Sequence, residues 1–171
     1  FKIMLHQRTL GKTISAAGVG LHSGEKVEIT LRPASENSGI RFRRVDCDPT
    51  QEIKAHANNV TDTRLGTTIS QNNVSVMTVE HLLAAFAGLG IDNACIDIHG
   101  PEVPIMDGCA ASFILLVELA GIIEQSAPKK FLRIKKNVKV EEDDKFAEFK
   151  PFNGYRLSFK IEFEHPMIQH K

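Results

Sequence analysis

The sequence predicts an α+β fold, in which a two-layer domain of sheet and helix is followed by the first strands of a second, similar domain. Three observations support this prediction. Strand-like alternation of apolar and polar residues fills most of positions 10–77, helical spacing follows at 79–89 and 110–120, and alternation returns after Lys130. The chain has 171 residues, 42% of them apolar, so it can bury a substantial core.

The composition argues against several classes of partner. Lys and Arg number 21, and Asp and Glu also number 21, so no overall field draws the chain to nucleic acid or to an anionic membrane surface. Cys47, Cys95 and Cys109 form no C-x-x-C pair and no even-numbered framework, which favours free thiols and a cytoplasmic location. The apolar runs are too short for a membrane span, and the first ten residues lack the apolar core of a secretory signal, so we expect neither.

The first third of the chain is dominated by strand signals. A hairpin is expected at 10–34, with its turn near residues 21–24, and residues 40–45 alternate again. A small β insert is expected at 61–77, because two alternating runs flank the polar turn Gln71-Asn72-Asn73.

Two helices are expected after the insert. Residues 79–89 should form an amphipathic helix with Thr78 as its N-cap. Five apolar side chains recur there at helical spacing, namely Val79, Leu82, Leu83, Phe86 and Leu89. A β-branched strand is expected at 93–98, and residues 110–120 should form a second helix closed by Gly121.

The composition changes at residues 126–130, which suggests a domain boundary. We therefore expect a first domain at 1–126 and the start of a second at 127–171. The alternating residues of the second part indicate three consecutive strands, at 131–140, 146–149 and 155–163. Antiparallel strands with no helix to cover their apolar face are not a stable unit, so we expect the chain to stop inside this domain.

The first turn of the 79–89 helix carries the pair Glu80-His81. Successive side chains on a helix turn by about 100°, which places His81 opposite the apolar stripe, on a face shared with Ala84, Ala85 and Gly88. An ordinary solvated face would carry Lys, Glu or Gln, so a face this bare leaves room for a ligand or another backbone.

The pair is suited to metal-assisted hydrolysis of an amide. The positive end of the helix dipole favours an ionised carboxylate and a neutral imidazole, so His81 can ligate a metal and Glu80 can act as a base toward water. A solvated helix start is the alternative interpretation, because a catalytic zinc normally needs three protein ligands. None of the six testable histidines is followed four residues later by Asp, Glu or His.

Several short sequence motifs indicate a family, which the spacing of candidate ligand residues does not. In order along the chain they are QRTL at 7–10, GVGLHSG at 18–24, TVEHL at 78–82, AGLGIDN at 87–93, PIMDG at 104–108, FAEFKP at 146–151 and EHP at 164–166. Together they resemble, in the family's own order, the zinc-dependent UDP-3-O-acyl-N-acetylglucosamine deacetylases of lipid A synthesis. The resemblance covers almost the whole chain and about the first half of a family member.

The resemblance implies an activity and part of a site. It implies zinc-dependent hydrolysis of the N-acetyl amide of UDP-3-O-(3-hydroxyacyl)-N-acetylglucosamine with release of acetate, with His81 as the first zinc ligand and Glu80 as the general base. The partner is then a small UDP-sugar lipid precursor. The family's other ligands, a His and an Asp four residues later, and its second catalytic His, would lie beyond Lys171. The chain alone is therefore expected to bind no zinc tightly and to be inactive.

Further residues lie around this half site by resemblance. Leu21 and His22 match a loop near the substrate cleft, and Leu65 and Thr67 belong to the insert that borders it. His22 also has a simpler interpretation as a polar turn residue. A non-catalytic α+β binding or interaction domain, in which the helix merely begins with two polar residues, is the alternative function.

Three positions in and near the insert have open interpretations. Arg64 and Gly66 depart from the residues most expected in the family's insert, which either alters contacts at the edge of the cleft or reflects tolerated surface variation. Asp107 precedes the second helix, and as a cap or turn carboxylate it would contribute on the order of 1 kcal/mol. By resemblance it would instead orient the active-site residues without binding the metal.

Overall fold

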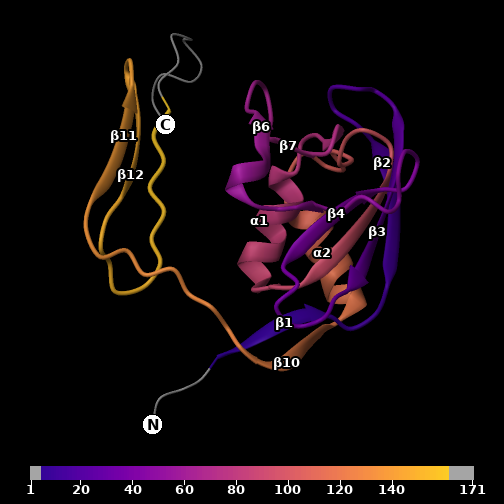
Figure 1. Cartoon of the computed structure of the whole chain (residues 1–171), viewed down its shortest axis with the longest axis horizontal. Coiled ribbons are helices and arrows are strands. Elements are labelled where there is room, and N and C mark those ends of the chain that lie inside the picture. The colour runs from indigo at the N-terminus through magenta and orange to yellow at the C-terminus, as the bar shows by residue number, and fades with distance from the viewer. Residues whose placement is uncertain (1–4, 162–171) are drawn as a thin grey trace. The chain divides into compact units, whose positions relative to one another are not determined.

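The computed structural model describes residues 5–161. The chain falls into two compact units divided between Lys130 and Phe131 (Figure 1). The first unit therefore includes residues 127–130, which the sequence grouped with the second domain. Neither helix in the described part of the chain is long and apolar enough to cross a membrane.

A five-stranded sheet forms one layer of the first unit. Its strands, in spatial order, are β2 (Ile14–Val19), β3 (Lys26–Pro33), β9 (Ala94–His99), β4 (Ile40–Arg44) and β5 (Ile53–Lys54). The central strand β9 pairs antiparallel with β3 and parallel with β4. The predicted hairpin at 10–34 and the predicted strands at 40–45 and 93–98 are confirmed.

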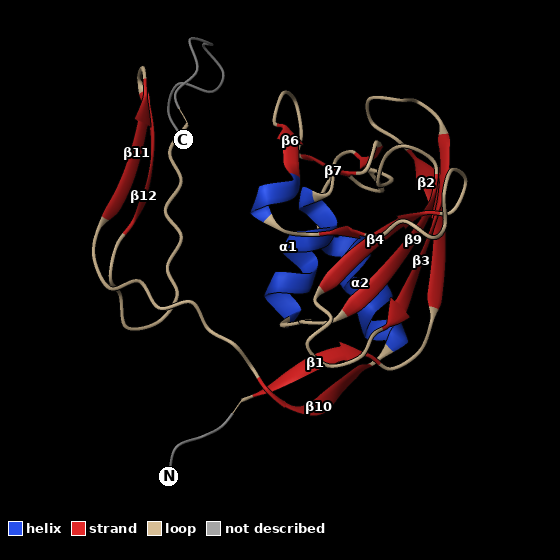
Figure 2. Ribbon diagram, in the orientation of Figure 1, coloured by secondary structure: helices blue, strands red, loops and turns tan. Residues whose placement is uncertain are grey.

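Two helices form the other layer, against one face of the sheet (Figure 2). They are α1 (Glu80–Leu89) and α2 (Ala111–Ala120), so both predicted helices are confirmed within one residue at each end. Gly90 ends α1 in the left-handed conformation, with a φ of 69°. A glycine is favoured there because a Cβ in that conformation costs about 1–2 kcal/mol.

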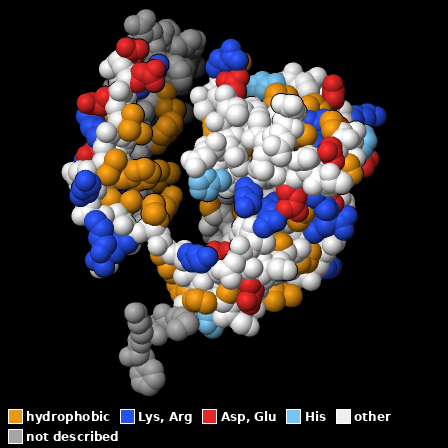
Figure 3. All heavy atoms as spheres, in the orientation of Figure 1, with side chains coloured by type: hydrophobic (Ala, Val, Ile, Leu, Met, Phe, Trp, Pro, Cys, Tyr) orange, Lys and Arg blue, Asp and Glu red, His pale blue; other side chains and the backbone are white. Residues whose placement is uncertain are grey.

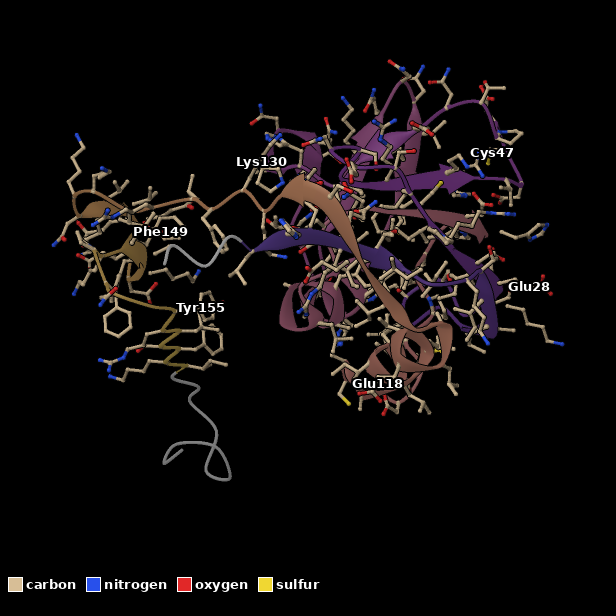
Figure 4. All side chains as sticks on the ribbon, turned by 90° about the horizontal axis from the view of Figure 1, so that it is seen from below. Glu28, Cys47, Glu118, Lys130, Phe149 and Tyr155 are labelled. Atoms are coloured by element: carbon tan, nitrogen blue, oxygen red, sulfur yellow. The ribbon has the colours of Figure 1, made fainter. Side chains whose placement is uncertain are left out.

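The core lies between the sheet and the helices. Strand β3 alternates as the sequence predicted, with three side chains fully buried: Val27, Ile29 and Leu31. The buried residues that face them from β9 and the helices include Ile96, Ile98, Leu82, Phe86, Phe113 and Val117. The opposite face of β3 is polar and exposed, and Glu28, labelled in Figure 4, belongs to it.

A second pair of strands joins the two ends of the first unit. Strand β1 (His6–Leu10) pairs antiparallel with β10 (Ile122–Pro128), a pairing that the sequence did not predict. Asn93 connects this pair to the sheet, because its Nδ2 donates to Gln7 Oε1 at 2.8 Å and to Gln125 Oε1 at 2.7 Å. Its Oδ1 accepts the Gly39 N–H at 2.9 Å. Asn93 is 1% exposed, and its polar atoms are satisfied within the protein.

The predicted insert forms a small three-stranded sheet of its own. Its strands are β6 (Val60–Asp62), β7 (Thr68–Gln71) and β8 (Val74–Val76), preceded by the short helix η1 (Ala57–Asn59). The turn between β7 and β8 falls where the sequence placed it, with Asn72 and Asn73 at φ values of 51° and 64°. Ile69 and Val76 are buried and attach the insert to the core.

The described part of the second unit, residues 131–161, contains fewer strands than the sequence predicted. Strand β11 (Val138–Glu142) pairs antiparallel with β12 (Lys145–Phe149). Residues 131–136 and 155–161 are not strands, so the expectation of three consecutive strands is wrong, and residues 162–164 lie outside the described part. Alternation creates an apolar face, but a strand also needs a neighbour with free N–H and C=O groups.

Apolar side chains gather on the surface of this unit (Figure 3). Those more than 60% exposed are Phe131, Leu132, Val140, Phe146, Phe149, Tyr155, Leu157 and Phe159. Phe149 and Tyr155 are labelled in Figure 4. A hairpin alone offers too little surface to bury these side chains. An alternating pattern is therefore not enough, by itself, to add a third strand to it.

We predict that Asn93→Ala lowers the free energy of unfolding by about 2–4 kcal/mol, because it removes three hydrogen bonds of a buried amide, to Gln7, Gly39 and Gln125. Urea unfolding of the chain would measure the change. Asn58→Ala is the matched control, because Asn58 is exposed, and its expected effect is within about 0.5 kcal/mol. Equal effects of the two substitutions would contradict the role of Asn93.

Candidate active site

Helix α1 begins directly after the insert, and its first residues are Glu80 and His81. The expectation that Thr78 caps this helix is wrong. The N-cap is Val79, and Thr78 has a φ of 56°, whereas a capping residue needs an extended backbone to aim its oxygen at the first N–H groups. The Thr78 hydroxyl donates instead to Glu102 Oε1 at 2.7 Å.

The carboxylate of Glu80 connects the insert to the start of α1. The backbone N–H of Thr67 donates to Glu80 Oε2 at 3.0 Å, and the N–H of Val79 donates to the Thr67 carbonyl at 3.3 Å. Glu80 and Thr67 are both half-buried. One carboxylate oxygen is therefore engaged in the fold, while Oε1 lies beside Gly66.

His81 lies outside the buried face of α1. The buried residues of this helix are Leu82, Ala85 and Phe86. His81 is half-buried, and Ala84 and Gly88 are exposed on its side of the helix. The expectation that Ala85 shares this bare face is wrong, because the buried face is centred nearer Leu82 than the apolar spacing suggested, and Ala85 turns inward.

The loop between β2 and β3 brings His22 to the insert. His22 Nε2 donates to the backbone carbonyl of Leu65 at 3.0 Å, since a carbonyl oxygen can only accept. Its neighbour Leu21 is 56% exposed. The predicted cleft residues from the loop and from the insert therefore do meet.

The turn of the insert at this place has an unusual backbone. Leu65 has a φ of 59° and is 87% exposed, so it bears the cost of a left-handed conformation without burying its side chain. Arg64 forms a bidentate pair with Asp62 in the same turn. That hydrogen bonding holds the pKa of the Asp62 carboxyl well below its usual range. The Arg64 side chain is 88% exposed, so the pair contributes little to stability.

Gly66 is the point where three side chains converge. A Cβ at this position would lie 3.4 Å from Glu80 Oε1, 3.5 Å from Thr78 Oγ1 and 3.7 Å from His22 Nε2. These are ordinary contact distances, so alanine would fit, whereas a larger side chain would cover the Glu80 oxygen. The glycine places no side chain beside that oxygen.

The residue that sequence reasoning missed is Glu102. It is 0% exposed, and its carboxylate accepts the backbone N–H groups of His22 and Ser23 as well as the Thr78 hydroxyl. Burial acts to raise the pKa of Glu102, but these hydrogen bonds outweigh it and hold the pKa below its ordinary value. The available signal was a carboxylate between two prolines, Pro101 and Pro104, but the sequence alone gave it no partner.

Asp107 lies in the turn that precedes α2. The backbone N–H of Cys109 donates to Asp107 Oδ1 at 3.2 Å, and the Cys109 thiol lies 3.4 Å from Oδ2. These bonds, the backbone one first, lower the pKa of Asp107, which is exposed. The N-cap of α2 is Ala110, so Asp107 stabilises the turn and not the helix end.

A complete metal site is not present in residues 5–161. No group of three or more His, Cys, Asp or Glu side chains lies together there in a way that could hold a metal ion. A zinc ion held by proteins normally has three or four such ligands. Within residues 5–161, His81 therefore has no partners with which to form such a site.

The sequence matches one family of known proteins over most of its length. Residues 7–171 match the family model of UDP-3-O-acyl N-acetylglycosamine deacetylase (LpxC), and the chain belongs to this family. It is 58% identical to the UDP-3-O-acyl-N-acetylglucosamine deacetylase of Xylella fastidiosa over 168 residues, which are 98% of this chain and 55% of that protein.

Other relatives bear the same name. The deacetylase of Thioalkalivibrio sulfidiphilus is 57% identical over 96% of this chain and 54% of its own length. That of Methylococcus capsulatus is 56% identical over 96% of this chain and 54% of its own length. The chain therefore spans about half the length of the curated relatives it matches.

We predict that Leu65→Gly leaves the free energy of unfolding unchanged or raises it by up to about 1 kcal/mol. The substitution removes the strain of a left-handed leucine, and it loses no buried apolar surface because the side chain is exposed. Ile69→Ala, in the same insert but 2% exposed, should lower the free energy of unfolding by about 2–5 kcal/mol. Both changes can be read from urea unfolding curves. A loss above about 1 kcal/mol in Leu65→Gly would mean that this leucine is structural.

Proposed function

We propose that the protein carrying these residues hydrolyses the N-acetyl amide of UDP-3-O-(3-hydroxyacyl)-N-acetylglucosamine and releases acetate, a step of lipid A biosynthesis in the cytoplasm. The observation that carries the proposal is the pair Glu80-His81 at the open start of α1, in a chain that belongs to a deacetylase family. The three free cysteines are consistent with a reducing compartment.

Glu80 is the general base of this proposal. Its Oε2 is held by the Thr67 N–H at 3.0 Å, which fixes the carboxylate. Its Oε1, beside Gly66, is the atom that would take a proton from the attacking water and later return it to the leaving amine. Glu80 would act on a water held near His81, its neighbour on the same turn.

Zinc is the cofactor of the proposed reaction, and when bound it supplies a Lewis acid that polarises the amide carbonyl. A helix of the first unit would offer it the imidazole of His81. The absence of a complete donor set in residues 5–161 means that the site would be shared with further ligands elsewhere in the protein.

The substrate is amphipathic, and so is the surface around Gly66. Leu21 and Leu65 expose apolar side chains, while the polar residues His22 and Thr67 bond to Leu65 and Glu80. Such a mixture suits a sugar ring that carries an acyl chain. We propose that these four residues border the substrate cleft, and that the second unit begins a domain similar to the first.

We predict that, in a protein of the relatives' full length, His81→Ala lowers the zinc content per chain and abolishes acetate release. Glu80→Gln should retain the zinc but lower kcat by a factor of about 10² to 10⁴, the range for loss of a general base. Metal analysis and an acetate assay on the UDP-sugar substrate measure both effects. Full activity in Glu80→Gln would refute the assignment of the base.

We also predict that the 171-residue chain by itself binds no zinc tightly and releases no acetate. One imidazole cannot hold a metal against water, because affinity depends on several deprotonated ligands held in place together. The isolated chain and a full-length relative should be assayed side by side for zinc per chain and for turnover. Stoichiometric zinc with turnover in the isolated chain would show that the site is complete within these residues.

A further inference from the structure

Glu102 is a buried carboxylate in a place where an apolar residue would be expected. Removing an ionised carboxylate from water costs several kcal/mol unless hydrogen bonds replace the lost hydration. Glu102 has those bonds: Oε1 accepts the Thr78 hydroxyl at 2.7 Å, Oε2 accepts the Ser23 N–H at 2.9 Å, and the His22 N–H lies 3.2 and 3.1 Å from the two oxygens.

The main chain of Glu102 is also fixed beside the start of α1. The Met77 N–H donates to the Pro101 carbonyl at 3.0 Å, and the Val103 N–H donates to the Met77 carbonyl at 3.0 Å. These bonds hold Glu102 next to Thr78, two residues before Glu80. From this fixed position the side chain reaches across to the loop that carries His22.

The fold makes room for this carboxylate with a glycine. A Cβ on Gly20 would lie 2.6 Å from Glu102 Oε2 and 2.1 Å from Ser23 Oγ, both shorter than real Cβ contacts allow. Gly20 is buried, and a glycine is favoured there because the Ser23 hydroxyl and the Glu102 carboxylate both approach its backbone closely.

We propose that Glu102 is a positioning residue of the active site, whose carboxylate holds the His22 loop and the first turn of α1 in the one arrangement that brings His22, Glu80 and Thr78 together at Gly66. The proposal rests on the proposed deacetylase function for its effect on turnover. Its structural content, that the loop and the helix start are held together through one carboxylate, does not depend on that function.

Glu102→Gln tests the proposal with almost no change in shape. Both carboxylate oxygens accept from donors, so the amide nitrogen of a glutamine must face at least one N–H or O–H donor. In the full-length protein we expect kcat to fall by about 10- to 100-fold, the effect of a misplaced catalytic group, with KM changed much less. Glu25→Gln, at an exposed position of the same loop, is the matched control and should leave kcat unchanged.

A second pair of variants keeps the test decisive if Glu102→Gln fails to fold. Thr78→Val removes the hydroxyl that Glu102 accepts and keeps the shape, whereas Thr78→Ser keeps the hydroxyl. We expect Thr78→Val to lower kcat and Thr78→Ser to restore most of the loss. A merely structural role of this hydroxyl would lower the melting temperature of Thr78→Val in step with its kcat.

A readout without activity separates this proposal from the proposed function. The imidazole resonances of His22 and the amide resonance of Thr67 should shift in Glu102→Gln and in Thr78→Val, and should stay in place in Glu25→Gln. Unmoved resonances together with wild-type kcat in folded Glu102→Gln would overturn the proposal. Shifted resonances in a full-length protein that binds no zinc and releases no acetate would support it while refuting the deacetylase function.

Discussion

The apolar layer between the five-stranded sheet and the two helices constrains the rest of the first unit. Each large side chain buried there, such as Ile29, Ile96 or Phe86, contributes about 1.5–3 kcal/mol relative to an exposed one. Rotation of α1 would expose Leu82 and Phe86 together. Apolar burial one to six residues away therefore sets the side of the helix from which Glu80 and His81 leave, and the Thr67 N–H then fixes the Glu80 carboxylate.

Polar contacts contribute less to stability than this apolar layer, and the contribution of each depends on how far it is buried. The exposed pair Arg64–Asp62 is screened by water, so it shapes a turn and adds little stability. The bonds to buried Asn93 and Glu102 cannot be replaced by water, so the loss of one partner costs about 1–3 kcal/mol. The segments attached by these two residues are the terminal strand pair and the candidate active site, respectively.

The candidate site is assembled from segments that are distant in sequence. His22 comes from a loop, Leu65 and Thr67 from the insert, and Glu80 from a helix. Between residues 131 and 161, no helix or further strand covers the hairpin of the second unit. Its hairpin leaves most of its aromatic side chains exposed, because a two-stranded sheet has no second layer against which to bury them.

By itself, the sequence determined the elements whose signal is local. The alternation of β3, the spacing of α1 and the polar turn of the insert each depend on neighbours within a few residues, and the structure contains all three. The blocks around His22 and Glu80 also indicated the family. Tertiary structure alone decided the β1–β10 pairing, the inward rotation of Ala85, the loss of the Thr78 cap and the place of Glu102. Each of these depends on a partner roughly 20 to more than 100 residues away. A local pattern does not encode which distant partner a hydroxyl, a helix face or a buried carboxylate will contact.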